Sequence, residues 1–187
     1  MRVGLFFGTF DPLHNGHLAV AGHFLAGEYV DEVWLVPSPQ NPLKDASKIA
    51  PIEKRIANIQ RVLNAVGERR LRVCDIEAKM PTPSYTVRTL RQLGKKFPGA
   101  TFSLIMGADT ATTLHHWREV NKLLNNWDIL IYPRRGYRVD KNLLAMCVRM
   151  QMVDAPLFEI SATQIRQLRA QGKCWRCFVP AGSGESA

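Results

Sequence analysis

Ten residues near the amino terminus combine glycines, histidines and a turn signal in a way that suits phosphate chemistry. Residues 8–17 read Gly-Thr-Phe-Asp-Pro-Leu-His-Asn-Gly-His and directly follow an apolar run. His14 and His17 are three positions apart, so both can lie on one side of a helix that opens at Gly16. Glycine lets a ligand come close, and the N–H groups of a helix N-terminus favour an anion. We therefore expect two imidazoles and a positive helix end around a polyphosphate.

The same stretch differs from the common nucleotide-binding loops. Its glycine spacing is not G-x-G-x-x-G, and no Lys-Ser/Thr pair follows Gly16 as in G-x-x-x-x-G-K-[ST]. The pair His14 and His17 could also hold a metal, but carboxylate or cysteine partners are missing nearby. No serine, cysteine or carboxylate of the stretch is placed to act as a nucleophile, so any nucleophile has to come from elsewhere.

The elements that must position this loop are short apolar runs alternating with amphipathic segments. Apolar runs without a polar face are typical of strands buried on both sides. We expect such strands at residues 2–7, 32–37, 71–76, 101–106 and 128–132, with a weaker one at 149–153. Helices are expected at residues 16–25, 51–66, from a cap at Ser84 to about residue 96, around 117–124, and at 161–170.

This alternation predicts an α/β fold with a Rossmann-like, doubly wound and mostly parallel sheet, in the order 3-2-1-4-5, with helices on both faces. Ligands of such sheets bind beyond the carboxyl ends of the strands, where the strand order reverses. The loop at residues 8–17 follows the first strand, and Gly107-Ala108-Asp109 follows the fourth. Since those two strands are neighbours in this order, we expect both segments at one site.

Composition and length exclude several classes of protein. The chain has 187 residues, 46% of them apolar, and carries no run of about 18 apolar residues. We expect a single domain at 1–180, a disordered tail at 181–187, no membrane association, and a cytoplasmic location because no signal peptide is visible. The net charge is +9, but basic and aromatic residues are not interleaved in a stripe, so a nucleic-acid partner is not expected.

Four cysteines are present, and Cys174 and Cys177 have C-x-x-C spacing near the carboxyl end. Thioredoxin-like motifs stand beside an early strand instead, and a second pair of zinc ligands at suitable spacing is missing. Free thiols are therefore expected, and a thiol redox protein remains an alternative. No metal held by protein ligands is predicted.

Two separated motifs resemble those of a known superfamily. Residues 8–17 resemble the H-x-G-H signature of the nucleotidyltransferases, and residues 160–166, Ile-Ser-Ala-Thr-Gln-Ile-Arg, resemble their second element, ISSTxIR. Further stretches are similar to one branch, the bacterial nicotinate-nucleotide adenylyltransferases. These are Pro83-Ser84-Tyr85-Thr86, Gly107-Ala108-Asp109, Trp117, and Tyr132-Pro133-Arg134-Arg135-Gly136. The resemblance covers roughly residues 2 to 180.

The resemblance implies a reaction that needs no protein nucleophile. That family joins nicotinate mononucleotide to ATP and forms deamido-NAD and pyrophosphate. The 5′-phosphate of the substrate attacks the α-phosphorus of ATP in line, so the protein has to position two anions and stabilise charge. The expected partners are thus ATP and nicotinate mononucleotide, with Mg²⁺ bound mainly through the ATP phosphates. Assembly into homo-oligomers is left open.

Site residues follow from the same resemblance. His14, His17 and Arg166 are implied as catalytic. The residues implied for ATP are Gly8, Thr9, Phe10, Gly16, Gly107, Asp109, Ile160, Ser161, Thr163 and Arg166. Those implied for the second substrate are Lys44, Tyr85, Thr86, Trp117 and Arg134, with Trp117 stacking on the pyridine ring and the Tyr85–Thr86 backbone binding its carboxylate.

Several positions depart from the family pattern. Ala162 replaces a usual serine, the stretch from Ser38 to Lys44 lacks the usual histidine, and Arg118 and Arg135 bring extra positive charge. The alternatives kept open are phosphopantetheine adenylyltransferase, an enzyme that accepts both nicotinate and nicotinamide mononucleotide, and a nucleotide-binding protein without catalysis. The stretches Pro83–Thr86 and His115-His116-Trp117 favour the nicotinate branch over the first of these.

Overall fold

A computed structural model describes residues 1–39, 49–140, 142, 144 and 147–183 of the chain. In this part, six parallel strands form one sheet in the order β3-β2-β1-β4-β5-β6. The strands are β1 (Arg2–Gly8), β2 (Glu32–Pro37), β3 (Leu71–Val73), β4 (Thr101–Gly107), β5 (Asp128–Tyr132) and β6 (Met150–Met152). The predicted Rossmann-like fold class is confirmed, and the weak strand expected at 149–153 extends the predicted order by one.

Both faces of the sheet are buried, which explains why its strands read as continuous apolar runs. In β1, Val3 and Leu5 belong to one core cluster and Phe6 to the other, because successive side chains of a strand point to opposite faces. In β4 the same alternation separates Leu104 from Ile105. The sheet is therefore the shared middle layer of two hydrophobic cores.

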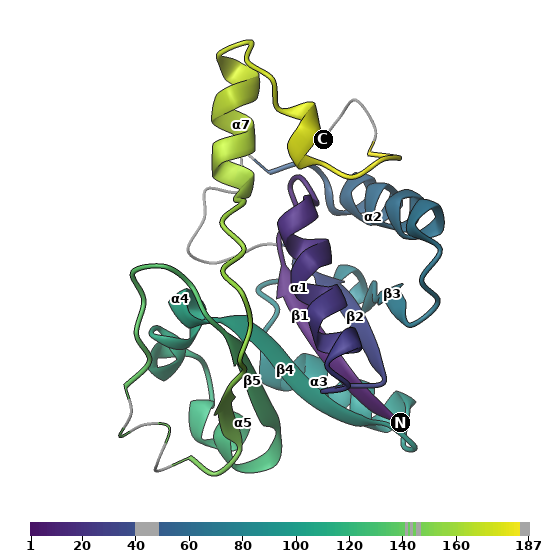
Figure 1. Ribbon diagram of the computed structural model, residues 1–187. Helices are drawn as coiled ribbons and strands as arrows, with labels where there is room; N and C mark the ends of the chain where they lie inside the picture. Colours follow the sequence, from purple (N-terminus) through teal and green to yellow (C-terminus); the bar gives the residue numbers. More distant parts are fainter. Residues whose placement is uncertain (40–48, 141, 143, 145–146, 184–187) are drawn as a thin grey trace.

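Helices cover the two faces separately. The helices α1 (Asn15–Ala26) and α2 (Ile52–Val66) pack on one face, while α3 (Thr86–Lys96), α4 (Ala108–Ala111) and α5 (Val120–Asn126) pack on the other. Figure 1 shows α1 lying along the sheet and α2 beside it. Short 3-10 turns are η2 (Ile76–Lys79), η3 (Leu114–His116) and η4 (Arg176–Phe178).

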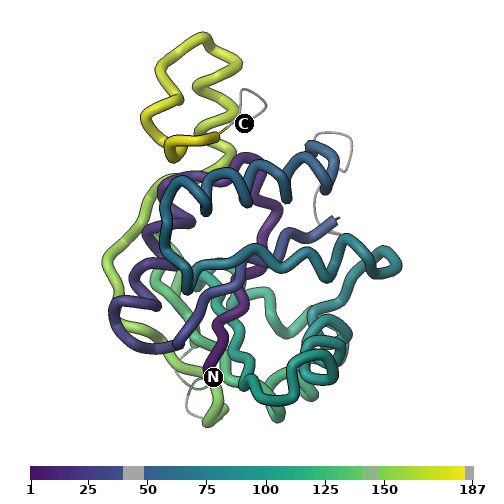
Figure 2. The backbone as a smooth tube through the Cα atoms, turned by 90° about the vertical axis from the view of Figure 1, so that its right-hand side faces the viewer, coloured from purple at the N-terminus to yellow at the C-terminus, as the bar shows by residue number. Residues whose placement is uncertain are grey.

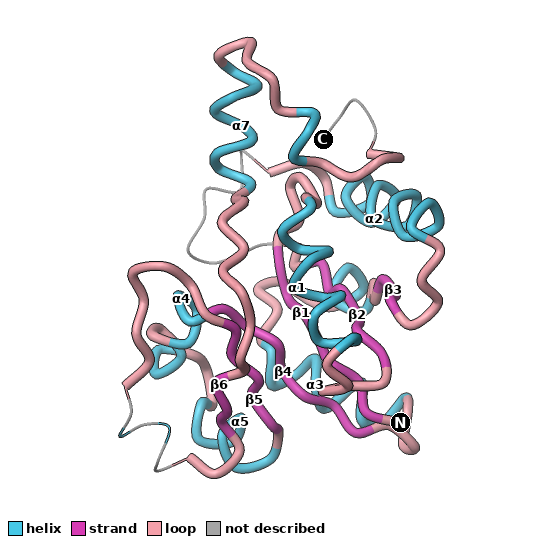
Figure 3. The backbone as a smooth tube through the Cα atoms, in the orientation of Figure 1, coloured by secondary structure: helices cyan, strands magenta, loops and turns pink. Residues whose placement is uncertain are grey.

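The carboxyl-terminal part returns to the first loop. After β6, which lies beside β5 in Figure 3, the chain runs as a long irregular segment to α7 (Ala162–Ala170). That segment is tied to α1 by a hydrogen bond between His23 Nε2 and the Asp154 carbonyl oxygen, at 2.9 Å. In Figure 2, α7 and the yellow segment after it stand out from the body of the molecule, above α2. Through Arg166 of α7, which bonds the Asp11 carbonyl, the carboxyl-terminal part reaches the loop after β1.

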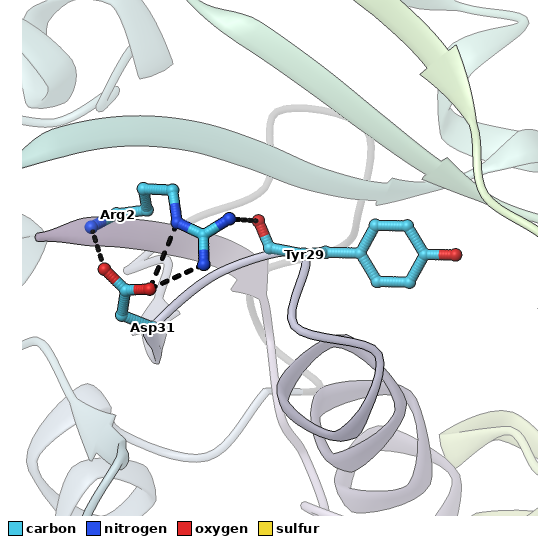
Figure 4. Close-up of polar contacts among 3 residues, drawn as sticks. All are labelled: Arg2, Tyr29 and Asp31. Atoms are coloured by element: carbon cyan, nitrogen blue, oxygen red, sulfur yellow. Dashed lines mark hydrogen bonds and ion pairs between the residues drawn. The ribbon is translucent and has the colours of Figure 1, made fainter.

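At the amino ends of the strands, an arginine–aspartate pair links β1 to the turn before β2, as drawn in Figure 4. The backbone N–H of Arg2 donates to Asp31 Oδ2 at 2.7 Å, and its Nε and Nη2 donate to Asp31 Oδ1 at 3.1 and 2.7 Å. Nη1 donates to the Tyr29 carbonyl at 3.5 Å. Because these groups are exposed to solvent, the ion pair contributes little energy, but it links the start of β1 to the turn before β2.

Three expected boundaries are wrong in detail. The third strand ends at Val73 because the chain turns into η2, so Ile76 belongs to that turn. Ser84 does not cap α3, whose N-cap is Tyr85; its hydroxyl donates instead to Glu77 Oε2 at 2.8 Å. The helix expected around 117–124 begins at Val120.

Two expectations fall on residues that the structure does not describe. Residues 184–187 of the expected tail and residues 40–48, which include Lys44, lie outside the described residues. In the part of the chain that the structure describes, no helix has the length and apolarity to cross a membrane.

Candidate functional site

The loop between β1 and α1 is held by an aromatic side chain that turns back under it. Phe10 has a left-handed backbone, with φ of 49°, a conformation that is unfavourable for a bulky side chain and needs support from its surroundings. Its buried ring packs edge-on against Phe6 at 5.8 Å and against His17 at 4.9 Å between centroids. A Cβ on Gly8 would lie 2.9 Å from this ring, so the glycine makes room for Phe10.

The two histidines of the loop form a stacked pair. Their ring centroids are 3.6 Å apart and the planes differ by 21°. The backbone N–H of His14 donates to His17 Nδ1 at 3.3 Å. In its neutral form His17 must therefore carry its proton on Nε2, which makes that atom a hydrogen-bond donor. The geometry thus presets the tautomer of His17.

His14 is the N-cap of α1 and is 2% exposed. Burial, and after it the positive charge of Arg134, lowers the pKa of His14 to about 4. The imidazole is therefore neutral at neutral pH. Its buried Nδ1 has no hydrogen-bond partner among the described residues. Since buried polar atoms are nearly always paired, this nitrogen is suited to a group that arrives with a ligand.

The second motif of the sequence lies against the first. Arg166 of α7 donates through Nη1 to the Asp11 carbonyl at 2.5 Å and through Nη2 to Thr163 Oγ1 at 3.2 Å. Ser161 caps α7 by accepting from the Gln164 N–H at 3.2 Å. The N-terminus of α7, with its free backbone N–H groups, therefore lies at this motif. The bond from Arg166 to Asp11 joins residues 155 positions apart in the sequence.

Gly16 and Ile160 are also brought together. A Cβ placed on Gly16 would lie 3.2 Å from Ile160 Cβ and 3.1 Å from His14 Nδ1. Any larger side chain at position 16 would therefore push against both motifs. The predicted role of Gly16 as room for adenine stays a prediction, but the close approach of backbone at this point is a feature of the structure.

An arginine and an aspartate extend the site to the ends of β4 and β5. Arg134 Nη1 donates to the Phe158 carbonyl at 2.8 Å, and Nη2 donates to the Tyr132 hydroxyl at 3.0 Å. Its Nε lies 3.8 Å from Asp109 Oδ1. A Cβ on Gly107 would collide with the same Asp109 oxygen. Arg134 therefore lies on the His14 side of the site, where its charge also acts on that imidazole.

The residues expected at the pyridine ring form a second group. Tyr85 is the N-cap of α3, Thr86 is its first residue, and Trp117 follows η3; Tyr85 and Trp117 both pack against the same core cluster. The guanidinium carbon of Arg118 lies 4.8 Å from the centroid of the Tyr85 ring, and that of Arg88 lies 5.3 Å away. In the sequence, Arg118 was noted only as extra positive charge, and Arg88 was missed; neither was expected beside Tyr85.

A buried glutamate supports this second group. Glu77 is 2% exposed and accepts hydrogen bonds from Thr89 Oγ1 at 2.7 Å and from Ser84 Oγ at 2.8 Å. Burial raises the pKa of Glu77, while the hydroxyl groups of Thr89 and Ser84 act in the opposite direction. Its partners stand on either side of Tyr85 and Thr86 in the sequence. The sequence analysis missed Glu77, because a single glutamate in a turn gives no sign of burial.

Arg55 of α2 was missed as well. Its side chain donates to four backbone carbonyls, those of Thr9, Ser38, Pro39 and Ala50. From the sequence, an arginine in an amphipathic helix is expected on the solvated face. The burial of Arg55 depends on the loops that follow β1 and β2, so no pattern in the sequence of α2 itself predicts it.

No protein metal centre is visible in the described ranges, where no three His, Cys, Asp or Glu side chains gather closely enough to hold an ion. His14 and His17 stack instead of presenting two nitrogens to one point. Cys174 and Cys177 are free, exposed thiols with their sulfur atoms 3.4 Å apart. Among these residues the chain therefore offers Mg²⁺ no set of protein ligands.

Comparison with known sequences gives one consistent result. The profile of the cytidylyltransferase-like family matches residues 5–168. The "Probable nicotinate-nucleotide adenylyltransferase" of Flavobacterium johnsoniae is 40% identical over 180 residues, which cover 96% of this chain and 92% of that protein. The protein of the same name from Bacteroides fragilis is 40% identical over 178 residues, covering 95% and 87%.

Comparison with solved structures concerns the fold alone, because the identities are low. The nicotinic acid mononucleotide adenylyltransferase of Plasmodium falciparum, complexed with NaAD, is similar with a TM-score of 0.79 and 17% identity. The match covers 95% of this chain and 90% of that one. The same protein complexed with APC gives a TM-score of 0.77.

Proposed function

The chain belongs to the nicotinate-nucleotide adenylyltransferase family, and from this premise we propose that it transfers the adenylyl group of ATP to nicotinate mononucleotide. The products are deamido-NAD and pyrophosphate. The observation that carries the proposal is the contact between Arg166 and the Asp11 carbonyl, which holds the start of α7 against the loop of His14 and His17. Two anion-binding elements from opposite ends of the sequence thereby face one site.

The chemistry proposed for this site uses positioning and charge. The 5′-phosphate of nicotinate mononucleotide attacks the α-phosphorus of ATP, and the bond to the leaving pyrophosphate breaks in line. His17 donates from Nε2 to a phosphate oxygen, while the neutral His14 accepts or donates through its unpaired Nδ1 without adding charge. Arg134 supplies positive charge beside them. Donors already oriented before the reaction lower its barrier because they need no rearrangement.

ATP is proposed to bring Mg²⁺ on its own phosphates, where the ion would neutralise charge on the leaving pyrophosphate. The described residues provide no cluster of ligands for it, so no protein ligand is assigned. The protein's contribution is to hold the phosphates through the two helix N-termini and the side chains around them. A cytoplasmic location and a single domain remain expectations from the sequence.

Selectivity for the carboxylate of nicotinate is supported by the charges around Tyr85. Arg88 and Arg118 lie against its ring, and Tyr85 is itself the N-cap of α3, where the first backbone N–H groups of the helix have no partner within the helix. A carboxylate gains more from such surroundings than the neutral amide of nicotinamide. The enzyme with dual substrate specificity is therefore the less favoured candidate.

The test is a pyrophosphate-release assay with ATP and one of three acceptors, namely nicotinate mononucleotide, nicotinamide mononucleotide or phosphopantetheine. We expect turnover with nicotinate mononucleotide and a kcat/KM at least about tenfold lower with the amide, the size of effect that one differential polar contact gives. Equal turnover of the first two would replace the proposal with dual specificity. Preference for phosphopantetheine would overturn it.

A further inference from the structure

A buried arginine connects the ends of the first two strands. Arg55, near the start of α2, is 3% exposed. Its Nη1 donates to the carbonyls of Thr9 at 2.7 Å and Ser38 at 3.0 Å, and its Nη2 donates to that of Pro39 at 3.2 Å. Its Nε donates to the Ala50 carbonyl at 2.8 Å. One guanidinium therefore joins the loop after β1, the end of β2 and the segment before α2.

Keeping a cation at this place is costly. Burial lowers the pKa of Arg55, and the charges of Asp11 and Glu53 act in the opposite direction. Neither carboxylate is close enough to form an ion pair, and no other among the described residues pairs with Arg55. An apolar side chain would fill the same core position without removing a charge from water. The reason for an arginine at this position must therefore be the backbone carbonyls to which it donates.

We propose that Arg55 is a positioning residue of the active site, which sets the backbone of residues 8–14 for the ATP phosphates by holding the Thr9 carbonyl against the end of β2. This inference rests on the proposed function, since it assigns the loop to ATP. Arg55 itself contacts no substrate, because its three nitrogens donate to backbone carbonyls inside the protein.

The peptide between Thr9 and Phe10 shows how this works. The C=O and N–H of a planar trans peptide point in opposite directions. Holding the Thr9 carbonyl toward Arg55 therefore directs the Phe10 N–H to the other side of the loop. The next residue is the strained one, with φ of 49° at Phe10, so the bond from Arg55 acts directly before the turn that leads to His14.

A second bond ties the same parts from the opposite direction. The Ala50 N–H donates to Asp11 Oδ2 at 3.0 Å, while the Ala50 carbonyl accepts from Arg55. The carbonyl of Asp11 in turn accepts from Arg166. The loop is thus held by α2 on one side and by α7 on the other, and displacement of one tie would shift the histidines relative to the phosphates.

Arg55→Lys tests the inference. Lysine keeps the charge but carries one nitrogen, which cannot span carbonyls that a planar fork reaches in several directions. We expect kcat to fall about 10- to 100-fold and KM for ATP to rise, because a misplacement near 1 Å costs on that order. Val62→Ala is the matched control, because it leaves a cavity in the core on the buried side of the same helix. It should lower Tm at least as much and leave kcat and KM unchanged well below Tm.

Equal kcat for Arg55→Lys and wild type at matched stability would overturn the inference. If Arg55→Lys does not fold, Asp11→Ala removes the bond to the Ala50 N–H from a partly exposed site and should lower kcat about three- to tenfold, the value of one hydrogen bond. Unchanged kcat in that variant would equally count against the proposal.

Binding separates this inference from the proposed function. If the wild type does not turn over nicotinate mononucleotide, the proposed function fails, and calorimetry with α,β-methylene-ATP then decides the role of Arg55. Weaker binding by Arg55→Lys than by Val62→Ala supports positioning of a phosphate loop. Equal affinity of the two variants, or no binding by the wild type, overturns it.

Discussion

At the scale of single residues, the environment divides the work between two histidines that look alike in the sequence. His17 has its Nδ1 occupied by a backbone N–H and presents a donor on Nε2. His14 is buried, has a pKa lowered to about 4 and keeps an unpaired Nδ1. The first is thus suited to donate to a phosphate, and the second to remain neutral in its buried position. The spacing H-x-x-H predicts that both face one site, but not these different states.

Replacing His17 tests its catalytic assignment. For His17→Ala we expect kcat to fall about 10²- to 10³-fold, as when one oriented donor to a developing charge is removed. The fold should persist, with Tm within a few degrees of wild type. His23→Gln is the control, because His23 stands in the same helix but bonds the Asp154 carbonyl. A kcat unchanged in His17→Ala would remove this residue from the mechanism.

The lowered pKa of His14 predicts a pH dependence of stability. Its ordinary pKa is about 6.5, so between that pH and about 4 the unfolded chain binds a proton that the folded protein does not. Protonation of His14 in the unfolded chain therefore lowers the free energy of unfolding as the pH falls below 6.5, and this loss is complete below about pH 4. From pH 7 to pH 5 we expect this group to lower the free energy of unfolding by about 2 kcal/mol.

Urea denaturation of the wild type and His14→Gln at both pH values measures this contribution. The variant cannot take up the proton, so its free energy of unfolding should decrease by about 2 kcal/mol less than that of the wild type over the same interval. Parallel curves for the two proteins would show that His14 titrates normally in the folded state.

At the level of secondary structure, the turn η2 holds the start of α3 through hydrogen bonds. Glu77 of that turn accepts from Ser84 Oγ, which precedes the N-cap Tyr85, and from Thr89 Oγ1, the fourth residue of the helix. The buried carboxylate therefore holds Tyr85 and Thr86 between two anchored neighbours. This arrangement explains why Ser84 leaves the capping position that its residue type predicts.

Glu77→Gln should affect one substrate more than the other. The amide nitrogen of glutamine cannot accept, so one hydroxyl loses its partner at a cost of about 1 kcal/mol. We expect KM for nicotinate mononucleotide to rise about fivefold, with a smaller change in KM for ATP. Initial-rate kinetics measure both constants. Glu68→Gln, at an exposed carboxylate bonded to Arg70, serves as the control. A uniform change in both KM values would contradict a local role.

At the scale of the whole molecule, the sheet order brings distant segments to one edge. The ends of β1 and β4 are neighbours, since Val3 pairs with Phe102 and Phe6 pairs with Ile105. The loop of residues 8–14, the start of α4 and the start of α7 therefore meet where the strand order reverses. Among the described residues, no three His, Cys, Asp or Glu side chains gather closely enough to hold a metal ion.

Removal of metal should accordingly affect activity and leave the fold unchanged. With excess EDTA we expect loss of pyrophosphate release, because ATP then lacks the Mg²⁺ that neutralises its phosphates. Tm of the protein without nucleotide should stay within about 1 °C, since an ion that does not bind the folded chain adds no stability. Added Mg²⁺ should restore the rate. A Tm lowered by several degrees would reveal a metal site of the protein itself.

The fold class, the order of the first five strands and the family of the chain could all be predicted before the structure was known. Apolar runs, helical periodicity and motif spacing are local properties of a chain, so they can be identified before it folds. The order of the strands was expected from the doubly wound fold class, and the sheet has that order with β6 added beside β5. The residue set expected for ATP was also chosen from motifs. The structure places Ile160 Cβ 3.2 Å from a Cβ built on Gly16 and bonds Arg166 to the Asp11 carbonyl, while the roles of these residues toward ATP stay predictions.

Which charges are buried, and which groups they bind, depends on the folded arrangement of the chain and could not be predicted from the sequence. Arg55 and Glu77 look like ordinary surface residues in the sequence, and His14 looks equivalent to His17. Their burial depends on loops contributed by other elements: Thr9, Ser38 and Pro39 reach Arg55 across the ends of two strands. The burial and the hydrogen-bond partners of a side chain depend on its neighbours in space, which a local sequence pattern does not identify.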